Sequence, residues 1–297
     1  MCFNLKQSLH RLDKKPIRSF FHHFCTQISF VMPRRKNKSS VWLGISLLIL
    51  LLLGGTAYLV YSTWKSLHKL PYYANQPLSE FEDLKFEHVF RSHIDGLLGI
   101  DISHYQGKIN WKQFDETLKD RKIEFFVVRA TMGDDQDKQF RSNWLALDTM
   151  KVARGAYHYY RPNQNSTLQA ENYIRTVKLK KGDFRPVLDI EKQSTIQSRE
   201  KLREGIRNWL ELVEKHYGVK PIIYTGDAFF GHILAGHGFE NYPLWVANYN
   251  PVMQPKSDYW VIWQFSEKGR VKGIKEKVDL NILRGGSRTL GNLLISE

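Results

Sequence analysis

Eight short runs of apolar and β-branched residues recur along the C-terminal two thirds of the chain. Each run is only a few residues long and ends at polar, glycine or proline positions, which is typical of buried β-strands. The runs occupy residues 97–103, 124–131, 152–160, 185–191, 221–226, 244–249, 259–266 and 278–283. The pattern therefore predicts eight strands after residue 96.

Four of the stretches between these runs repeat apolar residues at three- and four-residue spacing, which predicts helices. They are residues 111–122, 139–151, 167–178 and 199–217. The last is the clearest, because Leu202, Ile206, Trp209 and Val213 lie on one face with charged residues opposite. Gly218 directly after it is a typical stop signal for a helix.

Strands that alternate with helices predict an α/β fold, a TIM-barrel-like β/α barrel of eight strands. The connections after the fifth, sixth and seventh runs are too short for full helices. We therefore expect a barrel with an incomplete helical ring. An open α/β sheet is the alternative architecture.

A longer apolar stretch, VWLGISLLILLLLGGTAYLVY, begins at Val41 and contains no charged residue. As a helix it is long enough to span a hydrocarbon core of about 30 Å. Trp42, Tyr58 and Tyr61 flank it in the manner of interfacial aromatic belts. We expect residues 41–63 to form a transmembrane signal anchor in the lipid bilayer. A cleaved signal peptide is the alternative, although no small-x-small cleavage site follows closely.

The charges around this stretch predict its orientation. Arg34, Arg35, Lys36 and Lys38 precede it closely, so the positive-inside rule keeps the N-terminus in the cytoplasm. This predicts a basic cytoplasmic tail over residues 1–40, a stalk or linker over 64–96 and an exported globular domain over 97–297. The expected topology is a membrane crossed once, with the domain on its extracytoplasmic side. Met32 begins a compact basic segment of its own, so a shorter form starting there is an alternative.

Composition narrows the possible functions. Half of the net charge of +14 lies in residues 1–96, and no arginine-rich recognition helix or zinc-ligand spacing accompanies it. Nucleic acid is therefore not an expected partner. The two cysteines, Cys2 and Cys25, both precede the domain, which leaves it without a disulfide framework, a cysteine nucleophile or a cysteine metal site. No other metal-ligand spacing is present, and no metal is expected.

Carboxylates occupy comparable positions in three of the predicted strands. Asp101 lies in the first, Asp189 and Glu191 end the fourth, and Asp279 lies in the eighth. Alternate residues of a strand share a face, which places Asp189 and Glu191 about 6–7 Å apart. In a closed barrel the first and last strands are neighbours and the fourth lies across the mouth, so the four acids should line one pocket. Acids this close do not all ionise freely, and such pairs are the equipment of glycoside hydrolases.

Aromatic and amide side chains are expected at the same mouth. Tyr157 and Tyr159 end the third run, Trp245 and Asn248 lie in the sixth, and Gln264 lies in the seventh. Aromatic rings bury the apolar faces of sugars, while amides and hydroxyls bind their hydroxyl groups. These residues are predicted to bind substrate, with packing in the barrel core as the alternative for the rings. His158, between the two tyrosines, is interpreted as a core histidine rather than a catalyst.

One ordered set of motifs resembles a known family. Gly99-Ile-Asp101-Ile-Ser103-His-Tyr-Gln106-Gly107-Lys-Ile-Asn-Trp111 is similar to the opening strand and loop of the family-25 glycoside hydrolases, the Chalaropsis-type lysozymes. The similarity continues in order through residues 126–133, 155–159, 188–191, 223–225, 244–249, 263–264 and 278–281. It covers nearly all of residues 97–284.

The resemblance implies hydrolysis of the β-1,4 bond between N-acetylmuramic acid and N-acetylglucosamine in peptidoglycan glycan strands, with no cofactor. It also implies that Glu191 is the general acid, that Asp189 is its partner carboxylate, and that Asp101 and Asp279 complete the acidic site. Tyr224, in the fifth run, joins the substrate-binding residues by the same resemblance.

One departure from the family is visible, and several alternatives remain open. The family commonly has Thr-Glu-Gly where this chain has Thr131-Met132-Gly133, so substrate contacts or loop anchoring should differ. Asp189 is expected to assist through the 2-acetamido group of the substrate, whereas direct attack by a carboxylate and inversion through a bound water are the other mechanisms. The alternative functions are a non-catalytic, membrane-anchored peptidoglycan-binding module and an enzyme acting on chitin or another amino-sugar polymer.

Overall fold

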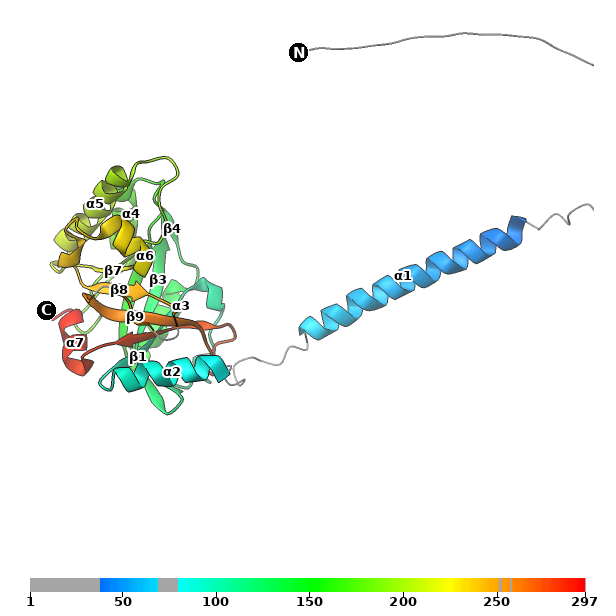
Figure 1. Cartoon of the computed structure of the whole chain (residues 1–297), viewed down its shortest axis with the longest axis horizontal. Coiled ribbons are helices and arrows are strands. Elements are labelled where there is room, and N and C mark those ends of the chain that lie inside the picture. The colour runs from blue at the N-terminus through cyan, green and yellow to red at the C-terminus, as the bar shows by residue number, and fades with distance from the viewer. Residues whose placement is uncertain (1–37, 69–79, 251–252, 257, 297) are drawn as a thin grey trace, which may run out of the picture. The chain divides into compact units, whose positions relative to one another are not determined.

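The computed structural model describes residues 38–68, 80–250, 253–256 and 258–296 (Figure 1). The chain forms two compact units, Met1–Lys69 and Leu70–Glu297. In the first unit, α1 (Lys38–His68) is a single helix, and its segment Trp42–Thr63 is long and apolar enough to cross a membrane by length and composition. The predicted apolar helix is therefore present. Most of the predicted cytoplasmic tail lies outside the described residues.

The second unit is built on a closed barrel of eight strands, and all eight predicted strands are present. Its strands are β1 (Leu97–Ile102), β3 (Arg121–Met132), β5 (Ala153–Tyr159), β6 (Val187–Asp189), β7 (Ile222–Gly226), β8 (Leu244–Ala247), β9 (Trp260–Gly269) and β10 (Val278–Leu283). The sheet closes because β1 pairs with both β3 and β10. This closure excludes the open α/β sheet.

Seven of the eight barrel strands are mutually parallel, but β10 runs antiparallel to both of its neighbours, β9 and β1. The connection from β9 to β10 is too short for the crossover that a parallel pair requires, so the chain turns back as a hairpin. The start of β10 therefore lies at the same end of the barrel as the C-terminal ends of the other strands.

Helices cover the outside of the barrel unevenly. Three of the four predicted helices are confirmed as α3 (Phe140–Met150), α4 (Ser166–Thr176) and α5 (Arg199–Tyr217). After β7 only short turns follow, namely α6 (Asp227–Phe229), the π-helical η3 (Phe230–Leu234) and the 3₁₀ turn η4 (Phe239–Asn241). In the part that the structure describes, no helix connects β8 to β9 or β9 to β10. The helical ring is incomplete, as predicted, and α7 (Gly286–Leu293) ends the domain.

The best-predicted helix, α5, has a clear start and stop in the sequence. The Ser198 hydroxyl accepts a hydrogen bond from the Lys201 backbone N–H and caps the first turn. Gly218 adopts a left-handed conformation (φ 73°) and donates its N–H to the Glu214 carbonyl, which ends the helix. The predicted apolar face is buried: Leu202, Ile206, Trp209, Leu210 and Val213.

The predicted helix over residues 111–122 is wrong. This segment contains turns, the 3₁₀ turn η2 (His104–Gln106) precedes it, and the two-residue strand β2 (Thr117–Leu118) folds back on the start of β3. Lys119 and Asp120 have positive φ angles of 50° and 63°, which make the tight turn between the two strands. The apolar spacing comes instead from Trp111 and Phe114, whose rings both pack against Phe126. A second short strand, β4 (Asp135–Gln136), pairs with the other end of β3.

The predicted linker over residues 64–96 also needs correction, because α2 (Glu80–Ser92) belongs to the folded domain. Phe86 and Phe90 are buried, and their rings contact Phe265 of β9 with centroids 6.1 and 6.2 Å away. Glu82 and Lys85 are buried as well. These two charged residues interrupt the apolar stripe, which is why the pattern resembled a polar stalk. Residues 69–79 lie outside the described part.

The interior of the barrel is packed below its mouth. Phe125 and Val127 of β3, Val187 of β6 and Ile222 of β7 form one apolar cluster with residues from the other strands. Gly99 leaves room for this packing, since a Cβ there would lie 2.2 Å from the Phe125 ring. Side chains one position further along these strands pack instead against the outer helices. The inward-facing positions that follow this layer carry the candidate site.

Candidate active site

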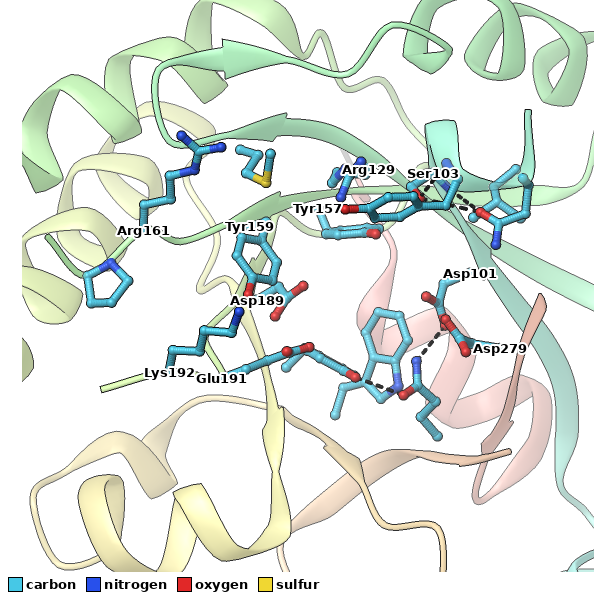
Figure 2. Close-up of a pocket in the computed structure, with 18 residues that line it drawn as sticks. Asp101, Ser103, Arg129, Tyr157, Tyr159, Arg161, Asp189, Glu191, Lys192 and Asp279 are labelled. Atoms are coloured by element: carbon cyan, nitrogen blue, oxygen red, sulfur yellow. Dashed lines mark hydrogen bonds between the residues drawn. The ribbon is translucent and has the colours of Figure 1, made fainter. Parts of the chain in front are cut away.

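A cavity of about 580 Å³ opens at the mouth of the barrel (Figure 2). All four predicted acids line it, together with five of the six predicted substrate-binding residues. The lining residues that the sequence predicted are Asp101, Asp189, Glu191, Asp279, Tyr157, Tyr159, Tyr224, Trp245 and Gln264. The structure therefore brings together residues that are far apart in the chain.

The reversed direction of β10 explains why Asp279 reaches this mouth. Asp101 is near the C-terminal end of β1, whereas Asp279 is the second residue of β10. The antiparallel register places the two residues opposite each other. On the other side of the mouth, Asp189 is the last residue of β6 and pairs with Tyr159 of β5 and Tyr224 of β7. Glu191 follows two residues later.

Asp101 is held by a network of amides, hydroxyls and an indole. Its Oδ2 accepts hydrogen bonds from Gln264 Nε2 at 2.9 Å and from Asn281 Nδ2 at 2.8 Å. The Trp245 indole N–H donates to Asn281 Oδ1 at 2.8 Å. The Tyr224 hydroxyl donates to Gln264 Oε1 at 2.7 Å, which turns the Gln264 amino group toward Asp101. Trp245 and Gln264 are almost fully buried, so their polar groups contact the network that holds Asp101 rather than solvent.

Two members of this network were not predicted as site residues. Asn281 follows Asp279 by two positions, and its buried amide donates to Asp101, as described above. Tyr249 donates its hydroxyl to Gln264 Oε1 at 2.5 Å. Asn281 could have been predicted from the sequence, because alternate residues of a strand share a face and Asn281 therefore shares one with Asp279. Tyr249 follows the end of β8, where no strand periodicity constrains its direction.

Burial and mutual repulsion raise the pKa values of these carboxyl groups. Burial raises the pKa of Asp101 to about 6, although hydrogen bonds from Asn281 and Gln264 oppose the rise. Burial and the charge of Asp101 raise the pKa of Asp279 to about 9. The pKa of Asp189 is raised well above its usual value by burial and by the charges of Glu191 and Asp101. Although Glu191 is exposed at the rim, desolvation by the surrounding protein raises its pKa as well.

One oxygen of Asp189 is left without a partner. Its Oδ1 atom is buried and makes no hydrogen bond within the described part of the chain. Because a buried carboxylate oxygen without a donor costs free energy, this atom is a candidate acceptor for a group of the substrate. Figure 2 shows the Asp189 carboxyl group directed into the cavity, between Tyr159 and Glu191.

A buried cation stands beside the acids. Arg129 lines the cavity, and its Nε donates to Asp137 Oδ2 at 2.9 Å. Asp137 also accepts from the backbone N–H of His104 at 3.0 Å. The Arg129 guanidinium lies 5.0 Å from the centroid of the Tyr105 ring. Its charge opposes the rise in the pKa of Asp189, so it favours the ionised form of that carboxyl.

The two ends of the cavity differ in charge. Arg161 and Lys192 lie at one end and Asp101 and Asp279 at the other, with Glu191 between them (Figure 2). The charge of Lys192 lowers the pKa of Glu191 and so partly opposes the effect of desolvation. Met132 also lines the cavity. The acid that the family commonly has at this position is therefore missing from the site itself.

Two other predicted residues lie away from the cavity. Asn248 is not among its lining residues, because its amide donates to Asp227 Oδ2 at 3.1 Å and its side-chain oxygen accepts from the Asn250 backbone. His158 is fully buried and stacks on Trp209, with ring centroids 5.4 Å apart. Burial lowers the pKa of His158 to about 4, so it is neutral. The interpretation of His158 as a core histidine is confirmed.

No group of three or more His, Cys, Asp or Glu side chains within residues 38–68, 80–250, 253–256 and 258–296 is arranged to hold a metal ion. A closed barrel that gathers four carboxyls with raised pKa values beside aromatic rings defines the class of the protein, which is a glycoside hydrolase.

Comparison with known proteins gives the family. The sequence profile of the Glycosyl hydrolases family 25 matches residues 100–274. The Escherichia coli (strain K12) protein YegX is 38% identical over 192 residues, which cover 63% of this chain and 69% of that protein. Lysozyme M1 of Streptomyces globisporus is 30% identical over 210 residues, which cover 66% of this chain and 70% of that protein. The chain belongs to glycosyl hydrolase family 25.

The solved structures agree with this assignment. The crystal structure of a bacterial lysozyme from Streptomyces coelicolor is 29% identical and superimposes with a TM-score of 0.60. The match covers 67% of this chain and 97% of the other. A family 25 glycosyl hydrolase from Bacillus anthracis is 28% identical, with a TM-score of 0.59 over 67% of this chain and 94% of the other.

Proposed function

We propose that this chain is a membrane-anchored N-acetylmuramidase that cleaves the β-1,4 bond between N-acetylmuramic acid and N-acetylglucosamine in peptidoglycan. Relatives that bear the name lysozyme support the reaction class. The observation that carries the proposal is the unpartnered Asp189 Oδ1, buried in a mouth where Glu191 lies at the rim. An acceptor and an acid so placed match an N-acetylated sugar bound across the mouth.

In the proposed mechanism, Glu191 donates its proton to the leaving glycosidic oxygen. Its raised pKa favours the protonated form that a general acid needs, and its exposed position leaves it accessible to a long polymer. After the bond breaks, the Glu191 carboxylate takes a proton from the attacking water. This exchange of roles returns Glu191 to its starting state.

Asp189 is proposed to orient the 2-acetamido group of the substrate. Its free Oδ1 accepts the amide N–H, so that the acetamido oxygen attacks the anomeric carbon while Glu191 protonates the leaving oxygen. A cyclic oxazolinium-like cation forms, and the positive charge favours the ionised form of Asp189. Water then opens this ring with net retention. Direct carboxylate attack and inversion are the competing mechanisms, and product stereochemistry followed by NMR distinguishes inversion from retention.

The charge of the cavity favours peptidoglycan over chitin. Arg161 and Lys192 lie at the end of the cavity beyond Glu191, where an anionic group of the substrate would be attracted. Peptidoglycan strands carry carboxylates on the peptides attached to their lactyl groups, whereas chitin carries none. The aromatic residues Tyr157 and Tyr159 would pack against sugar faces in either polymer.

The test is digestion of purified peptidoglycan by the full chain in detergent, beside the Glu191→Gln variant. New reducing ends at N-acetylmuramic acid, identified by mass spectrometry of the products, are the expected result. Sedimentation with the cell wall and no new reducing ends would instead identify a binding module. Products from chitin but not from peptidoglycan would assign the enzyme to a different amino-sugar polymer.

We further propose that α1 anchors the chain in a bacterial inner membrane, with the N-terminus cytoplasmic and the catalytic domain exported. The support is the length and apolar character of Trp42–Thr63 and the basic residues that precede it. A reporter protein that functions only outside the cytoplasm should be active when it is fused after Glu297. If the protein fused after Glu297 is active only in the cytoplasm, this topology is overturned.

A further inference from the structure

The helix α2 carries a buried lysine that contacts Tyr249, a member of the network around Asp101. Lys85 is only 5% exposed, and its ammonium donates to the backbone carbonyl of Tyr249 at 3.0 Å. Burial lowers the pKa of Lys85. Placing an ammonium in such surroundings costs free energy unless it is paired, so its position calls for an explanation.

Tyr249 connects this lysine to the acids. Its hydroxyl donates to Gln264 Oε1 at 2.5 Å, and Gln264 Nε2 donates to Asp101 at 2.9 Å. The chain of contacts from Lys85 to Asp101 therefore contains only two intervening residues. Tyr249 itself is 44% exposed and follows the end of β8, so apolar packing alone does not fix it.

A second charged residue of α2 fastens the helix to β9, the strand that carries Gln264. Ser266 donates its hydroxyl to Glu82 Oε2 at 2.5 Å, and Lys268 lies 3.5 Å from the other oxygen of Glu82. The aromatic contacts of Phe86 and Phe90 with Phe265 attach the same face of the helix. These contacts hold the helix at a defined position along β9. That position determines where the Lys85 ammonium lies.

We propose that Lys85 is a positioning residue that acts on Asp101 through Tyr249 and Gln264, and that α2 is part of the catalytic unit. The helix lies before residues 100–274, which match the family profile, so its role is additional to the matched barrel. The inference rests on the proposed function, because Asp101 matters only if the acids of the mouth perform hydrolysis.

The test compares variants of the full chain in detergent, using soluble peptidoglycan fragments as substrate. Lys85→Met keeps the aliphatic stem and removes the ammonium, and we expect kcat to fall about tenfold. KM should stay within about twofold, because the sugar-facing residues are untouched. Lys85→Arg, which restores a donor, should recover part of the loss. Lys119→Met is the matched control, since Lys119 pairs with Asp83 of the same helix but does not contact Tyr249.

A double-mutant cycle separates positioning from general support of the fold. Tyr249→Phe removes only the hydroxyl, and the double variant Lys85→Met/Tyr249→Phe should lose no more activity than the worse single variant. If the activity losses of the two single variants multiply in the double variant, the proposal is overturned. It is also overturned if Lys85→Met leaves kcat unchanged. A Lys85→Met variant as impaired as Lys119→Met would do the same.

A readout without catalysis keeps the inference independent of the proposed reaction. Backbone hydrogen exchange over residues 244–250 should become faster in Lys85→Met and remain unchanged in Lys119→Met. If the unmodified chain cleaves no peptidoglycan, the proposed function fails, and this measurement alone decides whether Lys85 holds Tyr249. Equal exchange in both variants would overturn the inference.

Discussion

Asp101 and Asp279 lie opposite each other on the antiparallel strands β1 and β10, and the charge of Asp101 helps to raise the pKa of Asp279. Burial raises both pKa values, to about 6 and about 9 respectively. Near neutral pH, therefore, the two carboxyl groups together retain about one proton. The pair carries roughly one negative charge, which the amides of Gln264 and Asn281 help to stabilise.

This pair makes the stability of the domain depend on pH. A carboxyl whose pKa is higher in the folded than in the unfolded state stabilises the fold below its unfolded pKa and loses that effect as pH rises through the folded value. For Asp279 the stabilising effect is lost over the range from about pH 4 to about pH 9. The melting temperature of the full chain should therefore fall between about pH 5 and pH 8, and fall less in Asp279→Asn. An identical pH slope in both proteins would contradict the shifted pKa.

Replacing Glu191 should remove catalysis without unfolding the protein. Glu191→Gln keeps the shape of the side chain but has no proton to donate, so kcat on peptidoglycan should fall about 10²–10⁴-fold. Because Glu191 is exposed at the rim, the free energy of unfolding should change by less than about 0.5 kcal/mol. Reducing-end release and urea unfolding measure the two effects. Full activity in this variant would remove Glu191 from the role of general acid.

The basic end of the cavity should affect substrate binding more than the chemical step. Arg161→Gln and Lys192→Gln should each raise KM for peptidoglycan severalfold at low ionic strength, with kcat little changed, because rim charges act mainly on encounter. The increase should shrink as salt is added. Lys181→Gln, an exposed lysine on the segment before β6, is the control and should leave KM unchanged. Unaltered KM values in both rim variants would argue against recognition of an anionic substrate there.

The interior packing below the site can be tested at a single glycine. In Gly99→Ala the new methyl group would lie 2.2 Å from the Phe125 ring, and we expect a destabilisation of about 1–3 kcal/mol. Gly226→Ala is the matched control, because its φ of −70° suits alanine and nothing lies within 4 Å of the added Cβ. Urea unfolding compares the two variants. Equal stabilities would mean that the Phe125 ring moves aside at little cost.

Much of the barrel could be predicted from the sequence, because each strand is short, apolar and bounded by turn residues. Helix α5 was predictable for a similar reason, since Ser198 and Gly218 mark its two ends. The direction of β10 was missed because alternation of inward and outward residues is the same in either direction along a strand. The short connection before β10 was the available signal, since a parallel pair needs a longer crossover. Asp279 was nevertheless expected at the mouth, and the structure places it there through an antiparallel pairing.

The missed helix has a different cause. Sequence patterns identify a surface helix by an unbroken apolar stripe, and in α2 Glu82 and Lys85 occupy buried positions within that stripe. Their partners, Ser266 and Tyr249, are distant in sequence and carry no local signal. Asn248 was predicted to bind substrate from its place in the sixth strand-like run, but its side chain donates to Asp227 in a neighbouring loop instead.

The seam between β1 and β10 joins the earliest and the latest strands of the barrel. Asp101 is made long before Asp279 during synthesis, and the two meet only when the last hairpin docks. An unfinished or unclosed chain therefore lacks this pair of carboxyl groups altogether. For an enzyme directed at the cell wall, this order of events would delay destructive chemistry until folding is complete.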